Sequence, residues 1–373
     1  MSRGPAQEPP EMRRSVTVLL GERSYPIEIG HGTLSELGSR VKSATETRQV
    51  MVVTVPPVGS RYAATVMRSL RSAGLRVKRF EVPDGERSKS LRQAALLYDR
   101  LLEAGADRST AVLALGGGVV GDLAGFVAGT LLRGLPLVQV PTSLLAMVDS
   151  SVGGKTGVNV TKGKNLVGVF HQPRLVWIDS ATLSTLPQRQ RRAGLAEVVK
   201  HAAIWDAQLF ERLEEGAESL LELSPGALLP MLERNCQIKA EVVSRDERED
   251  GLRMILNFGH TLGHAAETLS GYRGLLHGEA VAMGMVYAAR RSEAMGHCPA
   301  GTSERIEALL LRIGLPTELP DYPRSAYLSA VGVDKKKRDT RVHFVVLGAL
   351  GRAETVPLLP REIVPPGTRF GKR

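Results

Sequence analysis

The sequence predicts two domains, an N-terminal α/β domain with a mostly parallel sheet and a C-terminal domain that is mainly α-helical. The 373 residues are enough for two domains. Residues 15–187 alternate short β-branched runs with amphipathic stretches, which is typical of a parallel sheet covered by helices. From residue 188 to residue 360 helical periodicity dominates, so a different architecture is expected there.

The expected elements follow in chain order. In the first domain, strands are expected at 16–20, 50–55, 77–82, 111–115, 137–140 and 175–179, with helices at 61–72, 91–103 and 119–132. In the second domain, helices are expected at 188–204, 207–222, 226–244, 253–270, 277–296 and 302–313, followed by a strand at 342–347.

The two ends of the chain are polar. Residues 1–14 are rich in Pro, Glu and Arg and lack the apolar segment of a secretion signal, so we expect a disordered leader. Residues 361–373 are expected to form a polar tail. No apolar run approaches the roughly 18 residues that a membrane span needs. Cys236 and Cys298 are too few for a disulfide framework, which favours a reducing cytoplasm.

The net charge of +10 raises the question of nucleic-acid binding. However, the basic residues are scattered along the chain, and neither aromatic-interleaved nor zinc-finger patterns accompany them. We therefore expect no nucleic-acid partner and no membrane partner. A small anionic substrate would account for part of the excess positive charge.

A glycine-rich turn follows the strand expected at 111–115. The run Gly116-Gly117-Gly118-Val119-Val120-Gly121-Asp122 opens a helical pattern, the strand–turn–helix context in which backbone N–H groups bind a phosphate. No acidic residue stands about 20 positions later, as the usual dinucleotide fingerprint requires. Tight packing of helix against strand is the alternative explanation of these glycines.

A second polar segment ends like a nucleotide-binding P-loop, with Gly153-Gly154-Lys155-Thr156. The P-loop pattern needs glycine where Asp149 stands, so a nucleoside-triphosphate site is excluded. The segment gathers Asp149, Ser150, Ser151, Lys155, Asn159, Lys164 and Asn165. Its lysines suit an anionic ligand, and a solvated loop is the alternative.

Three segments of the helical half carry candidate metal ligands. His260 and His264 are four residues apart, on one face of a helix. His277 opens the next helix, and Glu197 lies in an apolar pattern where a carboxylate is costly to bury without a cation. A set of two histidines and one glutamate leaves coordination positions open, as a catalytic zinc requires. An ion pair of Glu197 with Lys200 or His201 explains the same spacing.

Seven runs along the chain together resemble 3-dehydroquinate synthase. They are PDGE at 83–86, LGGGVVGD at 115–122, VPTS at 140–143, VDSSVGGKTG at 148–157, GLAEVVK at 194–200, NFGHTLGH at 257–264 and LHGEA at 276–280. The resemblance extends in order from about residue 25 to residue 347.

This resemblance implies a Rossmann-like NAD-binding domain, a helical metal-binding domain and an active site between them. It implies a carbon–oxygen lyase of the shikimate pathway of aromatic amino acid biosynthesis, active as a cytoplasmic homodimer. The expected reaction converts 3-deoxy-D-arabino-heptulosonate 7-phosphate to 3-dehydroquinate and phosphate. It proceeds by transient oxidation with NAD⁺, phosphate elimination, reduction and intramolecular aldol closure. The expected metal is Zn²⁺, with Co²⁺ as the alternative.

The resemblance also implies roles for individual residues. The metal ligands would be Glu197, His260 and His277. The cofactor contacts would be Asp84, Gly85, Glu86, Arg87, Ser88, Lys89, Gly117, Gly118, Val119, Val120, Gly121, Asp122, Thr142, Ser143, Lys155, Lys164, Thr182, Leu183, Ser184 and Thr185. The substrate contacts would be Arg133, Asp149, Lys155, Lys164, Asn165, Lys200, Lys239, Arg253, Asn257, His264 and either Lys335 or Lys336. Of these, Lys155, Lys200, Arg253, Asn257 and His264 would be catalytic, and either His264 or the departing phosphate would move the proton.

One departure from the family pattern lies after the strand expected at 50–55. The family offers an acid or amide there to the adenosine ribose, whereas Val55-Pro56-Pro57-Val58 has neither and lacks two N–H donors. The competing functions are another sugar phosphate cyclase, such as one acting on sedoheptulose 7-phosphate, a metal-dependent polyol dehydrogenase, and a non-catalytic NAD-binding protein.

Overall fold

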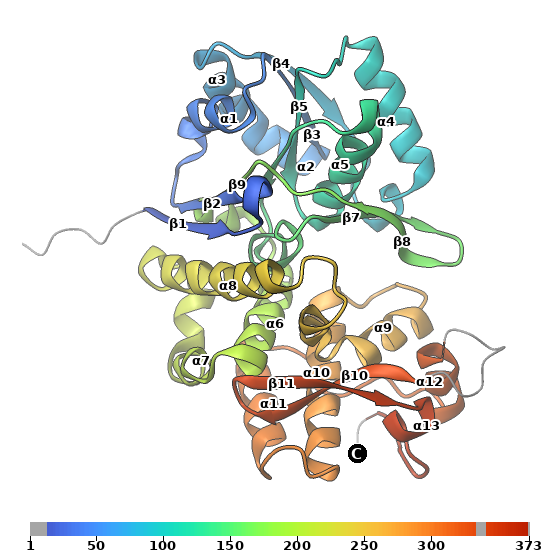
Figure 1. Ribbon diagram of the computed structural model, residues 1–373. Coiled ribbons are helices and arrows are strands. Elements are labelled where there is room, and N and C mark those ends of the chain that lie inside the picture. The colour runs from blue at the N-terminus through green and yellow to red at the C-terminus, as the bar shows by residue number, and fades with distance from the viewer. Residues whose placement is uncertain (1–12, 333–340, 372–373) are drawn as a thin grey trace, which may run out of the picture. The chain divides into compact units, whose positions relative to one another are not determined.

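The structure is a computed structural model that describes residues 13–332 and 341–371 (Figure 1). The chain divides into two compact units. The first contains the residues up to Leu186 together with Leu223–Ser244, and the second contains Pro187–Glu222 and the residues from Arg245 onward. Helix α8 (Pro225–Arg245) therefore packs almost entirely with the first unit, although the sequence analysis places it in the helical domain.

The first unit is built on a seven-stranded sheet with the order β1-β2-β9-β6-β5-β3-β4. Its strands are β1 (Arg13–Val18), β2 (Tyr25–Gly30), β3 (Gln49–Thr54), β4 (Arg76–Glu81), β5 (Thr110–Gly116), β6 (Leu137–Pro141) and β9 (Leu175–Asp179). All neighbouring strands are parallel except β1 and β2. The expected mostly parallel sheet is confirmed.

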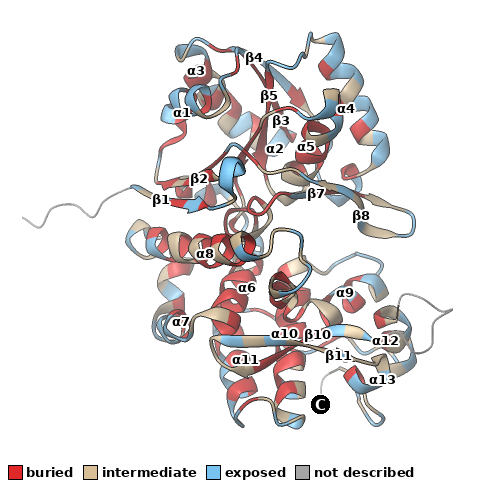
Figure 2. Ribbon diagram, viewed as in Figure 1, coloured by how far each residue is buried: buried red, intermediate tan, exposed pale blue. Residues whose placement is uncertain are grey.

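Helices cover both faces of this sheet. Helices α1 (Leu37–Thr45) and α3 (Ala64–Ser72) share one apolar core with it, and α4 (Leu91–Glu103) and α5 (Gly118–Thr130) share the other. In β3, Val50 and Val52 belong to the first core, whereas Met51 and Val53 belong to the second. Because both faces are buried, the central strands read as continuous apolar runs (Figure 2).

The first unit also contains elements that the sequence analysis missed. Strand β2 contains a proline and polar residues, and the hairpin of β7 (Lys155–Val160) and β8 (Gly163–Phe170) is rich in polar residues and glycine. The short helix α2 (Pro56–Val58) and a π-helical turn precede α3.

The expected leader is corrected at its last two residues. Arg13 and Arg14 belong to strand β1, whose backbone pairs with β2. Their side chains form ion pairs with Glu36 and Glu233, respectively. Residues 1–12 lie outside the described part of the chain.

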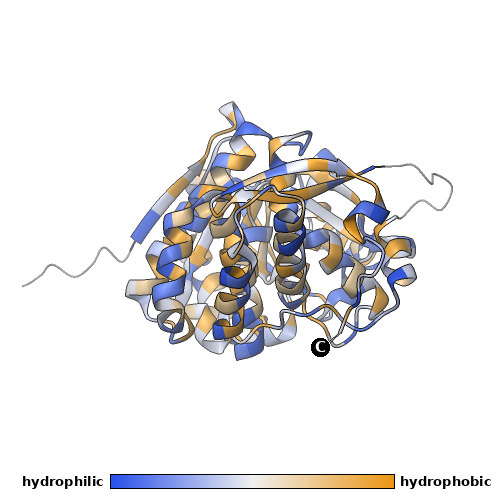
Figure 3. Ribbon diagram, turned by 90° about the horizontal axis from the view of Figure 1, so that it is seen from below, coloured by the Kyte–Doolittle hydropathy of each residue, from blue (hydrophilic) through white to orange (hydrophobic). Residues whose placement is uncertain are grey.

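The second unit is mainly helical, as expected. Its helices are α6 (Gln188–Trp205), α7 (Ala207–Leu221), α9 (His260–Leu269), α10 (His277–Ala294), α11 (Thr302–Ile313), α12 (Arg324–Val331) and α13 (Pro360–Ile363). The antiparallel strands β10 (Val342–Ala349) and β11 (Arg352–Leu358) pack beside them. In α11, Ile306, Leu309, Leu310 and Ile313 form the buried stripe of an amphipathic helix. Figure 3 shows that helices of the chain carry both hydrophobic and hydrophilic residues.

Two expectations for the second unit are corrected. The single helix expected at 253–270 is a 3-10 helix, Leu252–Asn257, followed by α9, because Gly259 between them adopts φ 80°. The expected polar tail contains packed apolar residues in its described part, 361–371: Ile363 and Val364 are buried, and the ring of Phe370 lies 4.0 Å from that of Tyr327.

No helix among the residues described here has both the length and the apolar character that crossing a membrane requires.

Candidate active site

Two helices of the second unit pack at backbone contact distance. A Cβ atom added to Gly278 of α10 would lie 1.8 Å from the carbonyl oxygen of Ala193 in α6. Ala193 and Glu197 are four residues apart and share one face of α6. The missing side chain at Gly278 therefore lets the start of α10, with His277, approach Glu197.

Helices α9 and α10 approach each other for the same reason. A Cβ atom on Gly284 would lie 1.9 Å from the carbonyl oxygen of Gly259, and one on Gly263 would lie 2.9 Å from that of Ala280. This close packing brings the ring centroids of His260 and His277 to 5.2 Å from each other. The glycines thus set the spacing of three functional side chains from three helices.

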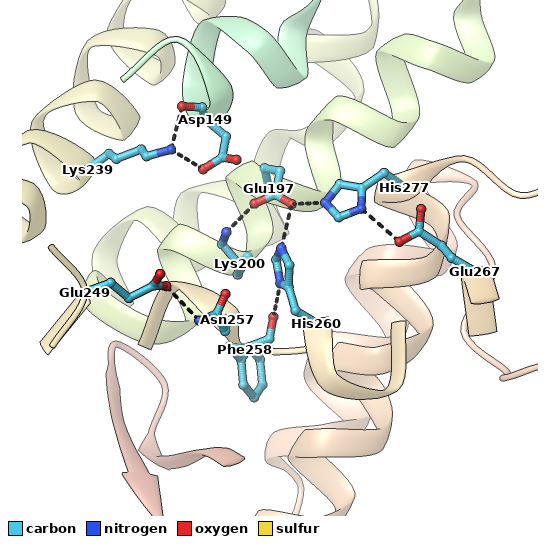
Figure 4. A network of polar contacts seen from close by, with 10 residues as sticks. All are labelled: Asp149, Glu197, Lys200, Lys239, Glu249, Asn257, Phe258, His260, Glu267 and His277. Carbon is cyan, nitrogen blue, oxygen red and sulfur yellow. Dashed lines mark hydrogen bonds and ion pairs between the residues drawn. The ribbon is translucent and has the colours of Figure 1, made fainter. Parts of the chain in front are cut away.

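Glu197 is fully buried at the centre of this group (Figure 4). Its Oε1 atom lies 3.8 Å from Nε2 of His260 and 3.7 Å from Nε2 of His277. Its Oε2 atom forms an ion pair with the equally buried Lys200. Within residues 13–332 and 341–371, neither oxygen accepts a hydrogen bond of ordinary geometry. Burying an ionised carboxylate with so few partners is costly, and a cation near Oε1 would offset that cost.

Both imidazoles direct Nε2 toward Glu197. Nδ1 of His260 lies 3.1 Å from the carbonyl oxygen of Phe258, and Nδ1 of His277 lies 3.3 Å from Oε2 of Glu267. Since these oxygens only accept, each Nδ1 donates a proton, and in a neutral ring Nε2 then carries the lone pair that can bind a cation. Burial first, and then the nearby charge of Lys200, lowers the pKa of His260 well below its usual range, so this ring is neutral at pH 7.

The positions of these atoms fit a divalent cation. Tetrahedral zinc with bonds of about 2.0–2.1 Å separates its ligand atoms by about 3.3 Å, close to the separations at Glu197. Small side-chain movements would complete the coordination. The Lys200 ion pair that explained the spacing of Glu197 is present too, and it occupies the other carboxylate oxygen.

His264 makes a second, overlapping set possible. One ring nitrogen from each of His260, His264 and His277 lies within 4.8 Å of the other two. The His264 side chain is exposed, whereas that of His260 is 12% exposed. The geometry therefore offers both a glutamate–histidine–histidine set and a set of three histidines.

Glu267 is a residue of this site that the sequence analysis missed. It lies on α9, seven residues after His260, and is 3% exposed. A glutamate at i+3 from His264 inside an apolar helix was the available signal, because a buried carboxylate needs a partner.

Two expected substrate contacts of the second unit lie beside an acidic turn. Arg253 is buried and donates to the carbonyl oxygen of Glu247, and Asn257 Nδ2 donates to Oε1 of Glu249 at 2.9 Å. Asp246, which the sequence analysis also missed, accepts the backbone N–H of Arg253 at 2.9 Å. This turn fixes the start of the 3-10 helix that carries both expected residues.

In the first unit, the expected cofactor contacts gather at one edge of the sheet. Residues 84–89, 117–122, 142–143 and 182–185 each follow the carboxyl end of a strand, namely β4, β5, β6 and β9. Because these strands are parallel, their carboxyl ends meet at the same edge. The strand order reverses between β3 and β5, and ligands of open α/β sheets bind at such a point.

Specific contacts connect these segments. Lys89 forms an ion pair with Asp122 of α5, and the N–H of Thr142 donates to the carbonyl oxygen of Gly116 at 2.9 Å. The Tyr62 hydroxyl lies 2.6 Å from Oγ1 of Thr185. The structure therefore brings the separate cofactor segments of the sequence together.

The glycines of the turn serve two purposes. A Cβ atom on Gly121 would lie 2.9 Å from Oε1 of Gln139 on β6, so this glycine permits close packing of helix on strand. Gly117 is the N-cap of α5 and its Cβ atom would meet the Ser143 hydroxyl at 3.3 Å. Close packing thus explains Gly121, whereas access of a ligand to the backbone explains Gly117.

The unusual prolines after β3 begin helix α2. Pro56 and Pro57 occupy its first two positions, where a helix has no internal use for the N–H groups that proline lacks. Val55 before them is buried. No polar side chain is therefore presented by Val55–Val58 at this carboxyl end.

The remaining expected residues of the first unit lie in three places. Lys239 on α8 donates to the backbone and side-chain oxygens of Asp149, so two expected substrate contacts pair with each other (Figure 4). Lys155, Lys164 and Asn165 lie on the β7–β8 hairpin. Arg133 is exposed after α5, in the left-handed region with φ 69°.

Comparison with known proteins identifies the family. Models described as 3-dehydroquinate synthase N-terminal and C-terminal match residues 79–193 and 194–337. A relative from Citrifermentans bemidjiense named 3-dehydroquinate synthase is 50% identical over 336 residues, which cover 90% of this chain and 93% of the relative. One from Pelobacter propionicus with the same name is 49% identical, covering 94% and 97%. The chain belongs to the 3-dehydroquinate synthase family.

Solved structures of other sugar phosphate cyclases share the fold. A 2-deoxy-scyllo-inosose synthase complexed with carbaglucose-6-phosphate, NAD⁺ and Co²⁺ superimposes with a TM-score of 0.85 at 30% identity, covering 94% of this chain and 98% of that one. A 2-epi-5-epi-valiolone synthase from Streptomyces hygroscopicus with NAD⁺ and Zn²⁺ gives 0.83 at 31% identity, covering 92% and 96%. The expected family and fold class are confirmed.

The roles of single residues remain predictions. The structure places Glu197, His260, His264 and His277 in one group and the cofactor segments at one sheet edge. Lys335 and Lys336 lie outside the described residues.

Proposed function

We propose that this chain is a 3-dehydroquinate synthase, which converts 3-deoxy-D-arabino-heptulosonate 7-phosphate to 3-dehydroquinate and phosphate. The observation that carries this proposal is the difference in identity between two kinds of relative. Proteins named 3-dehydroquinate synthase are 44–51% identical to the chain, whereas the sugar phosphate cyclases of known structure with other products are 29–31% identical.

The second unit supplies the metal ligands in this proposal. Glu197, His260 and His277 hold a divalent cation, Zn²⁺ or Co²⁺, since Oε1 of Glu197 faces both Nε2 atoms. The first unit holds NAD⁺ at the carboxyl edge of its sheet, with Gly117 and the start of α5 facing the pyrophosphate. When bound, NAD⁺ removes and returns a hydride, while the metal polarises the oxygen at the carbon being oxidised.

The chain's cations bind the two anionic groups of the substrate, its carboxylate and its phosphate. Lys200, Lys239 and Arg253 are buried, so a charge-assisted hydrogen bond from any of them acts with little screening by water. Lys155, Lys164 and Arg133 are more accessible. His264 handles a proton, because its exposed ring reaches the metal ligands without being needed as one.

The test is phosphate release from the heptulosonate substrate with NAD⁺ in less than stoichiometric amount. We expect many turnovers per NAD⁺, because the hydride returns to the substrate before product leaves. Removing the metal with a chelator should abolish phosphate release, and adding Zn²⁺ should restore it.

Each competing function has its own outcome in this assay. NADH that accumulates with turnover would indicate a polyol dehydrogenase. Phosphate release from sedoheptulose 7-phosphate alone would indicate another cyclase. A protein that binds metal and NAD⁺ yet releases no phosphate would be a non-catalytic member of the family.

We also propose that the chain acts as a cytoplasmic homodimer. The family resemblance supports the dimer. Cys236 and Cys298 are unpaired and buried, which agrees with a reducing compartment. Light scattering on the purified protein measures the mass in solution, and the mass of a monomer would contradict the proposed homodimer.

A further inference from the structure

Glu267 faces the side of His277 that does not face Glu197. Its Oε2 atom lies 3.3 Å from Nδ1 of His277, whose Nε2 lies 3.7 Å from Oε1 of Glu197. The imidazole therefore lies between two carboxylates from two helices, α9 and α6, and Figure 4 shows this arrangement.

The buried side-chain carboxylate of Glu267 needs a hydrogen-bond partner. It is 3% exposed, and an ionised carboxylate at such a place is costly unless it is hydrogen-bonded. Its backbone oxygen serves the local fold, accepting from Tyr272 N–H at 2.8 Å and from the Ser270 hydroxyl at 2.9 Å. These bonds at the end of α9 use the backbone oxygen of Glu267, so they do not account for its side-chain carboxylate.

His277 also needs an external support more than His260 does. The His260 ring is 12% exposed, and its Nδ1 donates to a backbone oxygen. His277 is the first residue of α10 and its side chain is 32% exposed, so packing restricts its ring less. A side chain that holds Nδ1 fixes both the rotation of the ring and the nitrogen that carries the proton.

We propose that Glu267 is a positioning residue that holds His277 in the Nδ1–H form, with Nε2 directed at the metal ion. This inference rests on the proposed metal set and adds to it a residue that does not touch the ion. Carboxylates that accept from a metal-bound histidine orient that ligand and strengthen its binding. Glu267 thus does for His277 what the Phe258 carbonyl does for His260.

The test compares zinc affinity and the cobalt spectrum of Glu267→Ala and Glu267→Gln with those of the parent. Zinc affinity is measured by competition with a chromophoric chelator, independently of turnover. We expect Glu267→Ala to bind zinc about 10–100-fold more weakly. Glu267→Gln should fall between the two, since its amide oxygen still accepts from Nδ1 but carries no charge. The visible bands of the Co²⁺-loaded variants should shift, because they report the ligand geometry.

The matched control is Glu293→Ala. Glu293 is a carboxylate of α10 that accepts from the backbone N–H and the hydroxyl of Ser303, both at 2.7 Å. Its loss should lower the thermal stability without changing zinc affinity or the cobalt bands. This separates a general loss of stability from an effect on the metal site.

The outcomes separate this inference from the proposed function. If the parent binds zinc tightly and both Glu267 variants bind it within about twofold of the parent with unchanged cobalt bands, Glu267 is not a positioning residue. If the parent itself binds no stoichiometric zinc, the metal set fails, and the inference fails with it. Glu267→Gln has nearly the shape of glutamate, so it keeps the test valid if the alanine variant does not fold.

Discussion

The Glu197→Gln variant should purify with little bound zinc, with affinity reduced at least about 100-fold, more than the loss of an outer hydrogen-bond partner costs. The substitution keeps the shape of the side chain but removes the anionic oxygen that lies 3.7–3.8 Å from both histidine nitrogens. Metal content of the folded protein and chelator competition measure the effect. Phosphate release should fall with it.

A control is needed because Glu197→Gln also breaks the buried ion pair with Lys200. Removing one partner of such a pair typically costs about 3–5 kcal/mol of stability. Lys200→Met breaks the same pair from the other side and keeps the carboxylate, so it should retain zinc. Equal loss of zinc in both variants would mean that the ion pair, and not ligation, holds the site together.

His264→Ala decides between the two overlapping ligand sets. If Glu197, His260 and His277 hold the ion, the variant should bind zinc nearly as the parent does while its turnover falls. A loss of zinc like that of Glu197→Gln would favour the set of three histidines, whose ring nitrogens lie within 4.8 Å of one another.

The second large effect is expected for Gly278→Ala. The new methyl group would lie 1.8 Å from the Ala193 carbonyl oxygen, and a backbone atom cannot rotate away. Helices α6 and α10 must separate, at a cost of about 3 kcal/mol. We expect the melting temperature to fall by about 6–12 °C. Zinc binding should weaken about tenfold or more, since His277 moves away from Glu197.

Gly226→Ala is the matched control for this variant. Gly226 is exposed near the start of α8, and a Cβ atom there would meet only the Ser224 hydroxyl, at 3.9 Å. Its substitution should leave stability unchanged or raise it by up to about 1 kcal/mol, and it should leave zinc binding unchanged. A Gly278→Ala variant as stable as this control would show that α6 and α10 do not need their close contact.

Sequence patterns predicted the elements whose apolar periodicity is strong. The central strands and the helices α6, α7, α10 and α11 lie where expected, because burial on both faces of a sheet or along one helical stripe leaves a regular pattern. Strand β2 and the β7–β8 hairpin were missed, since their residues are polar or include proline and glycine. The break before α9 was missed because one glycine in a left-handed conformation leaves the helical pattern on either side intact.

Within the site, the sequence by itself determined which chemical groups are available: a glutamate in an apolar helix, histidines at helical spacing and a glycine-rich turn after a strand. The tertiary structure alone decided which atoms face one another, because that depends on how closely helices from distant parts of the chain pack. The pairing of Oε2 of Glu197 with Lys200, the approach of its Oε1 to two histidines, and the contact of Glu267 with Nδ1 of His277 all follow from those packing distances. A side chain's partner across two helices leaves no periodic signal, so only the folded structure reveals it.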